Sequence, residues 1–323
     1  AVNPYSLGIA GNWRPYRTYA YYSARTESDA SQETSVRTSG TFADFVPFWN
    51  RQAADSTLKP AYDTSVWVWN AQSTLFNAKG FEMENKDPLG RYNAGLYGFD
   101  NALPVAVIQN SHYREAAFEG FEDYDFATNN KDTICSSSRN FDFSPYRSDF
   151  DNTIAHTGKY SLKIDGGQSA AVGTIVVAGD PEDFNFTVNT GSVSCSPSIV
   201  ALKSIRADKK VVLPSFSPLQ GKRMLVSVWV KEADDCNCSS YSKNNITVKT
   251  GTSNIVGRPS GNIIEGWQRI ELIADIPAEA TTFTLTLNAT GSTAVYFDDI
   301  RIHPYDANMK SFSYDPTTLR LMA

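Results

Sequence analysis

Residues 224–231, with the sequence MLVSVWVK, decide the fold of the central part of this 323-residue chain. Successive side chains of a β-strand point to opposite faces, so a strand separates odd from even positions. One face of this stretch carries only valines, which we predict to lie in a core: Val226, Val228 and Val230. The opposite face is mixed, and we expect it to meet solvent or a ligand: Leu225, Ser227, Trp229 and Lys231.

Similar short stretches occur on both sides of this strand and are separated by polar loops rich in Ser, Asn, Asp and Gly. Many short strands with turn signals and almost no helical periodicity indicate a β-sandwich or barrel. We therefore predict an all-β chain in which residues 118–305 form one jelly-roll β-sandwich. The other predicted strands are 118–126, 159–165, 170–177, 246–250, 267–275, 281–288 and 294–302.

The part before residue 118 carries short aromatic runs separated by turn signals such as Asp87-Pro88 and Asp100-Asn101. This pattern predicts a series of β-hairpins. Because isolated hairpins are marginally stable, we expect residues 1–117 to be a hairpin-rich region that is not independently globular. We expect residues 306–323 to be a linker or the start of a further unit.

Composition excludes several classes of protein. Hydrophobic residues make up 41% of the chain and charged residues 20%, which is enough apolar material for a packed core. The net charge is −6 and no Lys/Arg-rich run occurs, so we predict no nucleic-acid partner. The sequence contains neither a long apolar span nor a G-x-S-x-G, H-E-x-x-H or P-loop motif. We therefore predict no membrane span and no enzymatic activity.

The four cysteines lie in predicted loops and form no C-x-x-C pair: Cys135, Cys195, Cys236 and Cys238. With only three widely spaced histidines, a zinc site is not expected. The loop setting of the cysteines predicts that at least two of them form a disulfide, as in an exported protein. The connectivity stays open, and four free thiols are the alternative.

Four segments in order resemble the galactose-binding-like jelly rolls, a family that includes many carbohydrate-binding modules. They are GFEDYDF (120–126), AHTGKYSLKI (155–164), MLVSVWVK (224–231) and AVYFDDIRIHP (294–304). The resemblance covers residues 118–305. It implies the sandwich fold and a carbohydrate-binding or adhesive function.

The same resemblance implies two sites. Glu122, the backbone carbonyl near Lys159 and Asp298 match positions that hold a structural calcium ion (Ca²⁺) in similar modules, and hard oxygen ligands suit this ion. The alternative is that both carboxylates are strand-end residues satisfied by backbone N–H groups. Trp229 and Tyr296 are the candidate rings for stacking under a sugar. The alternative is that Trp229 packs under a loop.

The flanking segments 80–98 (GFEMENKDPLGRYNAGLYG) and 311–323 (SFSYDPTTLRLMA) resemble the regions beside YD-repeat (RHS-like) cores of very large bacterial surface proteins. This implies a secreted or cell-surface module, associated with the bacterial outer membrane. Its partners would be a glycan, the rest of a parent chain or a neighbouring surface protein. A purely structural spacer or cap of a hairpin array, without a ligand, is the other function that we carry forward.

Overall fold

The computed structural model describes residues 11–22, 45–54, 56–60, 62–124, 126, 139–179, 186–193, 196–207, 213–234 and 238–323. The prediction of an all-β fold is confirmed, since two short 3-10 helices are the only helical elements in these ranges. They are η1 (Tyr113–Glu115) and η2 (Ser144–Asp149). In the described part of the chain no helix has the length and apolarity needed to cross a membrane.

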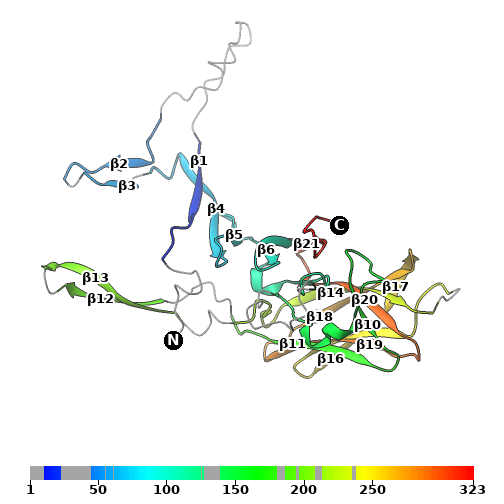
Figure 1. The fold of residues 1–323 in the computed structure, drawn as a ribbon. Coiled ribbons are helices and arrows are strands. Elements are labelled where there is room, and N and C mark those ends of the chain that lie inside the picture. The colour runs from blue at the N-terminus through cyan, green and yellow to red at the C-terminus, as the bar shows by residue number, and fades with distance from the viewer. Residues whose placement is uncertain are drawn as a thin grey trace, which may run out of the picture. The chain divides into compact units, whose positions relative to one another are not determined.

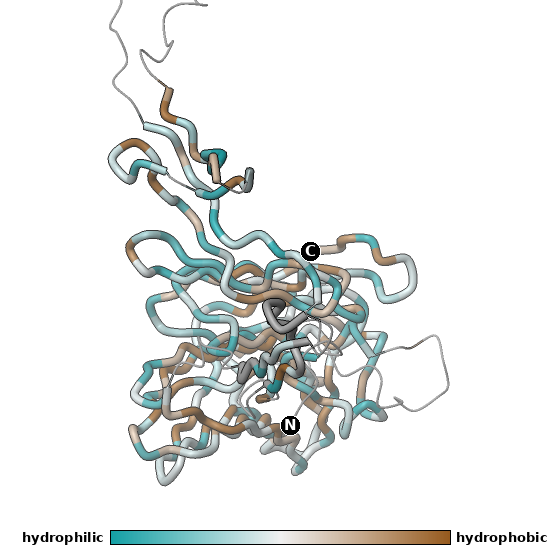
Figure 2. Tube along the Cα trace, turned by 90° about the vertical axis from the view of Figure 1, so that its left-hand side faces the viewer, coloured by the Kyte–Doolittle hydropathy of each residue, from teal (hydrophilic) through white to brown (hydrophobic). Residues whose placement is uncertain are grey.

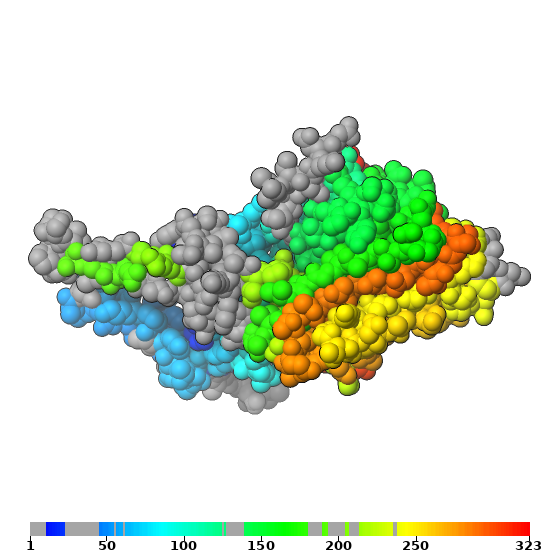
Figure 3. Space-filling model, turned by 90° about the horizontal axis from the view of Figure 1, so that it is seen from below, coloured from blue at the N-terminus to red at the C-terminus, as the bar shows by residue number. Residues whose placement is uncertain are grey.

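Two antiparallel sheets form the sandwich (Figure 1). The first has the strand order β17 (Pro259–Ile264), β18 (Trp267–Asp275), β14 (Arg223–Glu232), β20 (Val295–Pro304), β10 (Ser161–Ile164) and β9 (Phe150–Asp151), and β8 (Ala117–Glu119) also pairs with β20. The second has the order β11 (Ser169–Ile175), β19 (Thr282–Ala289), β15 (Asn244–Thr250) and β16 (Ser253–Gly257). In Figure 3 the green segment that contains β11 lies beside the orange strand β19, its partner in this sheet.

The core lies between these two sheets, as the alternation of the sequence predicts. Hydrophobic and hydrophilic residues alternate along the strands of the sandwich (Figure 2). The predicted core valines of β14 are fully buried: Val226, Val228 and Val230. From the second sheet, Ile246, Leu285 and Leu287 are also fully buried in the same cluster. Burying each such side chain contributes roughly 1.5–3 kcal/mol, so this layer is the main source of stability.

A second sheet system contains the predicted hairpins. Its strand order is β4 (Trp67–Phe76), β5 (Glu82–Lys86), β6 (Tyr92–Gly98), β7 (Leu103–Gln109) and β21 (Asn308–Ser311). A small core of its own includes Leu96 and Ile108 from the hairpins, Tyr113 and Phe118 from the following segment, and Met309 from β21. Within residues 306–323, β21 pairs with β7 and so adds a strand to the hairpin sheet.

The compact units also differ from the expected boundary at residue 117. Residues 74–85 and 91–323 belong to the same compact unit, which holds the sandwich and most of the hairpin sheet. Among the described residues of this unit, β12 (Phe186–Val193) and β13 (Ser196–Ala207) pair only with each other.

The other compact unit comprises residues 14–73 and 86–90. In it β1 (Arg17–Tyr21) pairs with the first part of β4, and β2 (Trp49–Arg51) pairs with β3 (Leu58–Pro60). Aromatic rings contact one another here, and Phe48 stacks on Tyr62 at 4.8 Å between ring centroids. None of the described residues of this unit is buried, so its rings form a surface cluster rather than a core.

Candidate functional site

One loop of the sandwich joins the residues that the sequence singles out for calcium. The Oε1 atom of Glu122 accepts backbone N–H hydrogen bonds from Lys159 (2.5 Å) and Tyr160 (2.8 Å). The Oδ2 atom of Asp298 accepts backbone N–H hydrogen bonds from His156 (2.7 Å) and Thr157 (3.2 Å). The two carboxylates thus hold residues 156–160 between them. We call this arrangement of Glu122, the backbone of 156–160 and Asp298 the loop clasp.

A glycine is required at the centre of the loop clasp. Gly158 has a φ of +67°, in the left-handed region that L side chains rarely adopt. In addition, a Cβ atom at this position would lie 2.2 Å from Oε1 of Glu122. Both the backbone conformation and the close approach of the carboxylate therefore exclude a side chain here. This explains the glycine in the segment AHTGKYSLKI.

The loop clasp concentrates negative charge in a buried place. Burial, with smaller contributions from the carboxylates of Asp299 and Asp315, raises the pKa of Glu122 to about 7 against the two backbone hydrogen bonds, which lower it. Burial, followed by the charge of Asp299, also holds the pKa of Asp298 well above its usual range. The Oε2 atom of Glu122 is buried and has no hydrogen-bond partner in the described part of the chain. A bound proton or a cation would satisfy this oxygen.

The loop clasp differs from the calcium site that the resemblance implies. Lys159 presents its N–H group to Glu122, where the resemblance implies a carbonyl ligand. The described residues contain no group of three or more His, Cys, Asp or Glu side chains placed to hold a metal ion. Calcium prefers six to eight oxygen ligands. An ion here would therefore use Glu122 and Asp298 and depend on backbone carbonyls for the remainder.

The loop clasp also places His156 on the predicted sugar platform. The Nδ1 atom of His156 lies 2.7 Å from Oδ2 of Asp299. Its ring stacks on Trp229 at 4.2 Å between centroids, with an angle of 17° between the planes. One face of the half-buried Trp229 is therefore covered by a loop residue, as the alternative interpretation proposes. The sequence shows His156 only as a loop residue, and no spacing signal indicates this contact.

Tyr296 does not offer a platform, which corrects the sequence-based assignment. Its side chain is only 7% exposed. Lys163 and Lys231 lie directly opposite Tyr296 on the two neighbouring strands, and long side chains in such positions pack against each other. A sugar needs an accessible ring face to stack on, and a residue as buried as Tyr296 does not provide a stacking platform.

The sandwich also contains a polar cavity of about 500 Å³. We call it the loop cavity. It is lined by the segment 146–151 around η2 and β9 and by residues of β10, β11 and the turn that connects them: Tyr146, Ser148, Asp149, Phe150, Asp151, Lys163, Ile164, Asp165, Gln168, Ser169 and Ala170. Its volume falls within the roughly 300–1,000 Å³ that ligand pockets occupy.

The walls of the loop cavity are fixed by backbone contacts. The hydroxyl of Tyr146 accepts the N–H of Ala171 (2.8 Å) and donates to the carbonyl of the same residue (3.2 Å). Oδ1 of Asp151 accepts N–H groups of Thr153 (2.7 Å) and Ile154 (3.1 Å). Partial burial raises the pKa of Asp151, but hydrogen bonds from Thr153 and Ile154 and the charge of Lys163 outweigh it and lower the pKa overall. Asp151 is thus a carboxylate at neutral pH.

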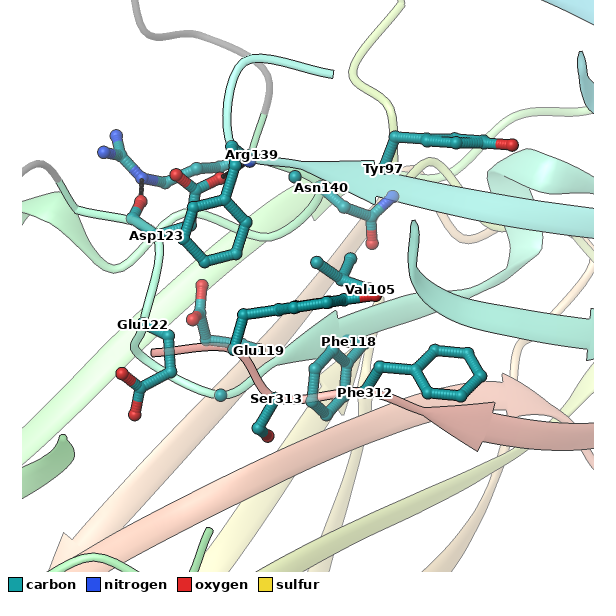
Figure 4. Close-up of a pocket in the computed structure, with 14 residues that line it drawn as sticks. Tyr97, Val105, Phe118, Glu119, Glu122, Asp123, Arg139, Asn140, Phe312 and Ser313 are labelled. Atoms are coloured by element: carbon teal, nitrogen blue, oxygen red, sulfur yellow. Dashed lines mark hydrogen bonds between the residues drawn. The ribbon is translucent and has the colours of Figure 1, made fainter. Parts of the chain in front are cut away.

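A second, smaller pocket lies among aromatic residues of the hairpin sheet and the C-terminal segment (Figure 4). The rings of Phe118 and Phe312 lie beside Val105, and Glu122 lies on the opposite side of the group. Its volume is about 40 Å³, far below the roughly 300 Å³ at which ligand pockets begin. This pocket has room for ordered water but not for a sugar ring.

Glu119, which lines this small pocket, is a buried acid. It accepts hydrogen bonds from the N–H of Phe121 (2.6 Å) and the hydroxyl of Tyr124 (2.6 Å). Burial raises its pKa to about 8 in spite of these bonds. The contacts tie the end of β8 to the following turn, so Glu119 has a structural role.

Among the cysteines, Cys238 is disulfide-bonded. The other three predicted disulfide residues lie outside the described part of the chain: Cys135, Cys195 and Cys236.

Comparisons with known proteins give only partial likenesses. No family model matches the sequence, and no curated protein matches it. Among solved structures, "Family 16 Carbohydrate Binding Module-2" shares 13% identity over 47% of this chain and 82% of its own, with a TM-score of 0.26. The CBM22-1 xylan-binding domain from Paenibacillus barcinonensis Xyn10C shares 13% identity over 48% of this chain and 78% of its own, also with a TM-score of 0.26. At these values the likeness assigns neither a family nor a ligand to this chain.

Proposed function

We propose that the β-sandwich is a non-catalytic glycan-binding module that takes its ligand at the loop cavity. The observation that carries this proposal is the convergence of three side chains on the cavity: Lys163, Asp165 and Gln168. In the described part of the chain none of these side chains makes a hydrogen bond, so their polar groups are available to a ligand. An ammonium group donates, a carboxylate accepts and an amide does both, which suits the hydroxyl groups of a sugar.

The cavity also supplies an aromatic surface. The ring of Tyr146 is held in place through the two hydrogen bonds of its hydroxyl to Ala171. A ring fixed before binding loses little entropy when a ligand packs on it. Asp151 does not fit the role of a general acid, because its pKa is lowered rather than raised. The arrangement therefore supports binding without a chemical step.

We further propose that the protein is secreted or lies on the bacterial cell surface, as a module of a larger surface protein. The disulfide at Cys238 supports this location, because disulfides persist in oxidising compartments and are rare in the cytosol.

Calcium at the loop clasp remains part of this proposal. The buried Oε2 of Glu122, which has no hydrogen-bond partner among the described residues, supports a cation at this position. When bound, calcium would supply positive charge between Glu122 and Asp298. The loop 156–160 would then be held by electrostatic attraction as well as by backbone hydrogen bonds.

One observation favours a structural spacer as the second candidate function. The chain leaves the hairpin sheet after β7 and returns to it in β21, and these two strands are paired neighbours. A module inserted in this way can lengthen or cap a hairpin array without binding anything.

The two functions are separated by binding measurements on the full chain. We expect binding on a glycan array, followed by at least a tenfold loss of affinity in Gln168→Ala, the cost of about one well-placed hydrogen bond. Lys249→Ala is the control, since Lys249 is exposed and does not line the cavity. If no glycan binds, or if Gln168→Ala binds as well as the control, the glycan-binding proposal is wrong and the spacer is favoured.

A further inference from the structure

The charges of the loop cavity are unbalanced. Among the described residues, its lining contains three carboxylates, Asp149, Asp151 and Asp165, and one ammonium group, Lys163. Three negative charges and one positive charge leave a net charge of −2 at neutral pH. The nearby Arg147 does not line the cavity, and its guanidinium lies over the ring of Phe126 at 5.7 Å.

Among the described lining residues Lys163 is the one cation, and it lies near a carboxylate. Asp151 lies opposite Ser161 in the β9–β10 pair, and Lys163 is two residues further along β10, on the same face. The charge of Lys163 acts on Asp151 and lowers its pKa. The field of Lys163 is therefore partly cancelled by Asp151, and the carboxylates of Asp149 and Asp165 are left without a compensating cation from the lining.

We propose that the loop cavity selects neutral glycans and rejects acidic ones. This inference rests on the proposed glycan-binding function and names the ligand class of the same site. A neutral sugar offers hydroxyl groups to the carboxylates and to Gln168. A uronate or sulfate group would bring another negative charge among Asp149, Asp151 and Asp165, and like charges placed together oppose binding.

The ligand chemistry can be tested on the full chain with two matched probes. One is a galactose oligosaccharide, and the other is a galacturonate oligosaccharide of the same length. At low salt we expect the neutral probe to bind at least about tenfold more tightly than the acidic probe. Added salt should reduce this difference in affinity, because the Debye length falls from about 30 Å at 0.01 M to about 3 Å at 1 M.

A charge variant tests whether the lining causes the selection. Asp165→Asn removes one negative charge but keeps a hydrogen-bonding side chain. We expect the affinity for the acidic probe, relative to the affinity for the neutral probe, to rise several-fold. Asp306→Asn is the control, because it removes the same charge from a residue that does not line the cavity.

The outcomes separate the two proposals. The inference is supported if the neutral probe binds more tightly than the acidic probe and if this difference in affinity becomes smaller with added salt and in Asp165→Asn. Equal or tighter binding of the acidic probe overturns the charge selection and leaves glycan binding standing. If these probes and a wider neutral glycan panel all fail to bind, glycan binding itself fails and the inference fails with it.

Discussion

The side-chain amide of Asn110 donates hydrogen bonds to the backbone oxygen (3.2 Å) and to the carboxylate (3.1 Å) of Asp306, although the two residues are 196 positions apart. Asn110 follows β7 directly, and Asp306 lies two residues before β21. The entry and exit of the sandwich thus meet at one point beside the hairpin sheet. Inserted domains are tolerated when their ends lie close together in this way.

This arrangement predicts that β21 stabilises hairpins more than 200 residues away. Met309 is 9% exposed and packs in the small core with Leu96 and Ile108. We expect Met309→Ala to lower the free energy of unfolding of the hairpin sheet by about 2 kcal/mol or more. Faster hydrogen exchange in β6 and β7 would report it. Lys310 is the exposed neighbour of Met309, and Lys310→Ala should change the free energy of unfolding by less than about 0.5 kcal/mol. Equal effects of the two variants would refute the role of Met309.

The loop clasp yields a prediction about two glycines. Gly158 and Gly167 have similar positive φ values, +67° and +76°, but a Cβ at Gly167 would meet nothing within 4 Å. Gly167→Ala should therefore cost only the backbone strain, about 1–2 kcal/mol. Gly158→Ala should cost clearly more, because its Cβ collides with the carboxylate of Glu122.

Chemical denaturation of both variants measures the difference. Repeating the pair in a Glu122→Ala background should bring the two costs together, since the colliding group is gone. If the costs are already equal in the wild-type background, Glu122 does not lie against Gly158 in solution.

The strands of the sandwich could be predicted because their alternation is local. The predicted strand 267–275 coincides with β18, and 224–231 and 294–302 agree with β14 and β20 to within two residues. The predicted strand 118–126 is shorter in the structure, where β8 ends at Glu119. The reason is a turn in which Phe121 has a φ of +61° and its N–H bonds to the side chain of Glu119.

The functional geometry was less accessible from the sequence. The resemblance identified Glu122 and Asp298 as candidate site residues, but it did not predict the stacking of His156 on Trp229. The loop cavity was missed entirely, because it forms where η2 and β9 meet the connection between β10 and β11 in space. β12 and β13 were also missed, as their segment lacks a sustained apolar alternation.

The raised pKa of Glu122 predicts a pH dependence of stability. Its folded-state pKa of about 7 lies above the unfolded value of about 4.3, so the folded protein binds the proton more tightly. The stability contributed by this group is complete below pH ~4.3 and is lost as the pH rises to about 7. Without calcium, we expect the free energy of unfolding to fall by about 3 kcal/mol over this interval. Because the pKa of Glu119 is raised to about 8, the fall should continue towards pH 8.

Denaturant unfolding at several pH values in the presence of chelator measures this slope. Glu122→Gln removes the titrating group and keeps an oxygen that can accept the N–H groups of Lys159 and Tyr160. This variant should make the free energy of unfolding nearly independent of pH below pH 7. An unchanged slope in Glu122→Gln would show that the carboxyl of Glu122 is not the group that titrates.

The final prediction concerns calcium at the loop clasp. An ion between Glu122 and Asp298 would join residues 176 positions apart, and it would compensate two buried carboxylates. A ligand that binds only the native state stabilises it by about 2.7 kcal/mol when present at 100 times its dissociation constant.

Chelation should therefore lower the melting temperature of the full chain, and Asp298→Ala should have a similar effect. Both treatments together should add little, because they remove the same interaction. Asp165→Ala, outside the loop clasp, should respond to chelator like the wild type. A melting temperature that is the same with calcium and with chelator would mean that the backbone N–H groups alone satisfy the two carboxylates.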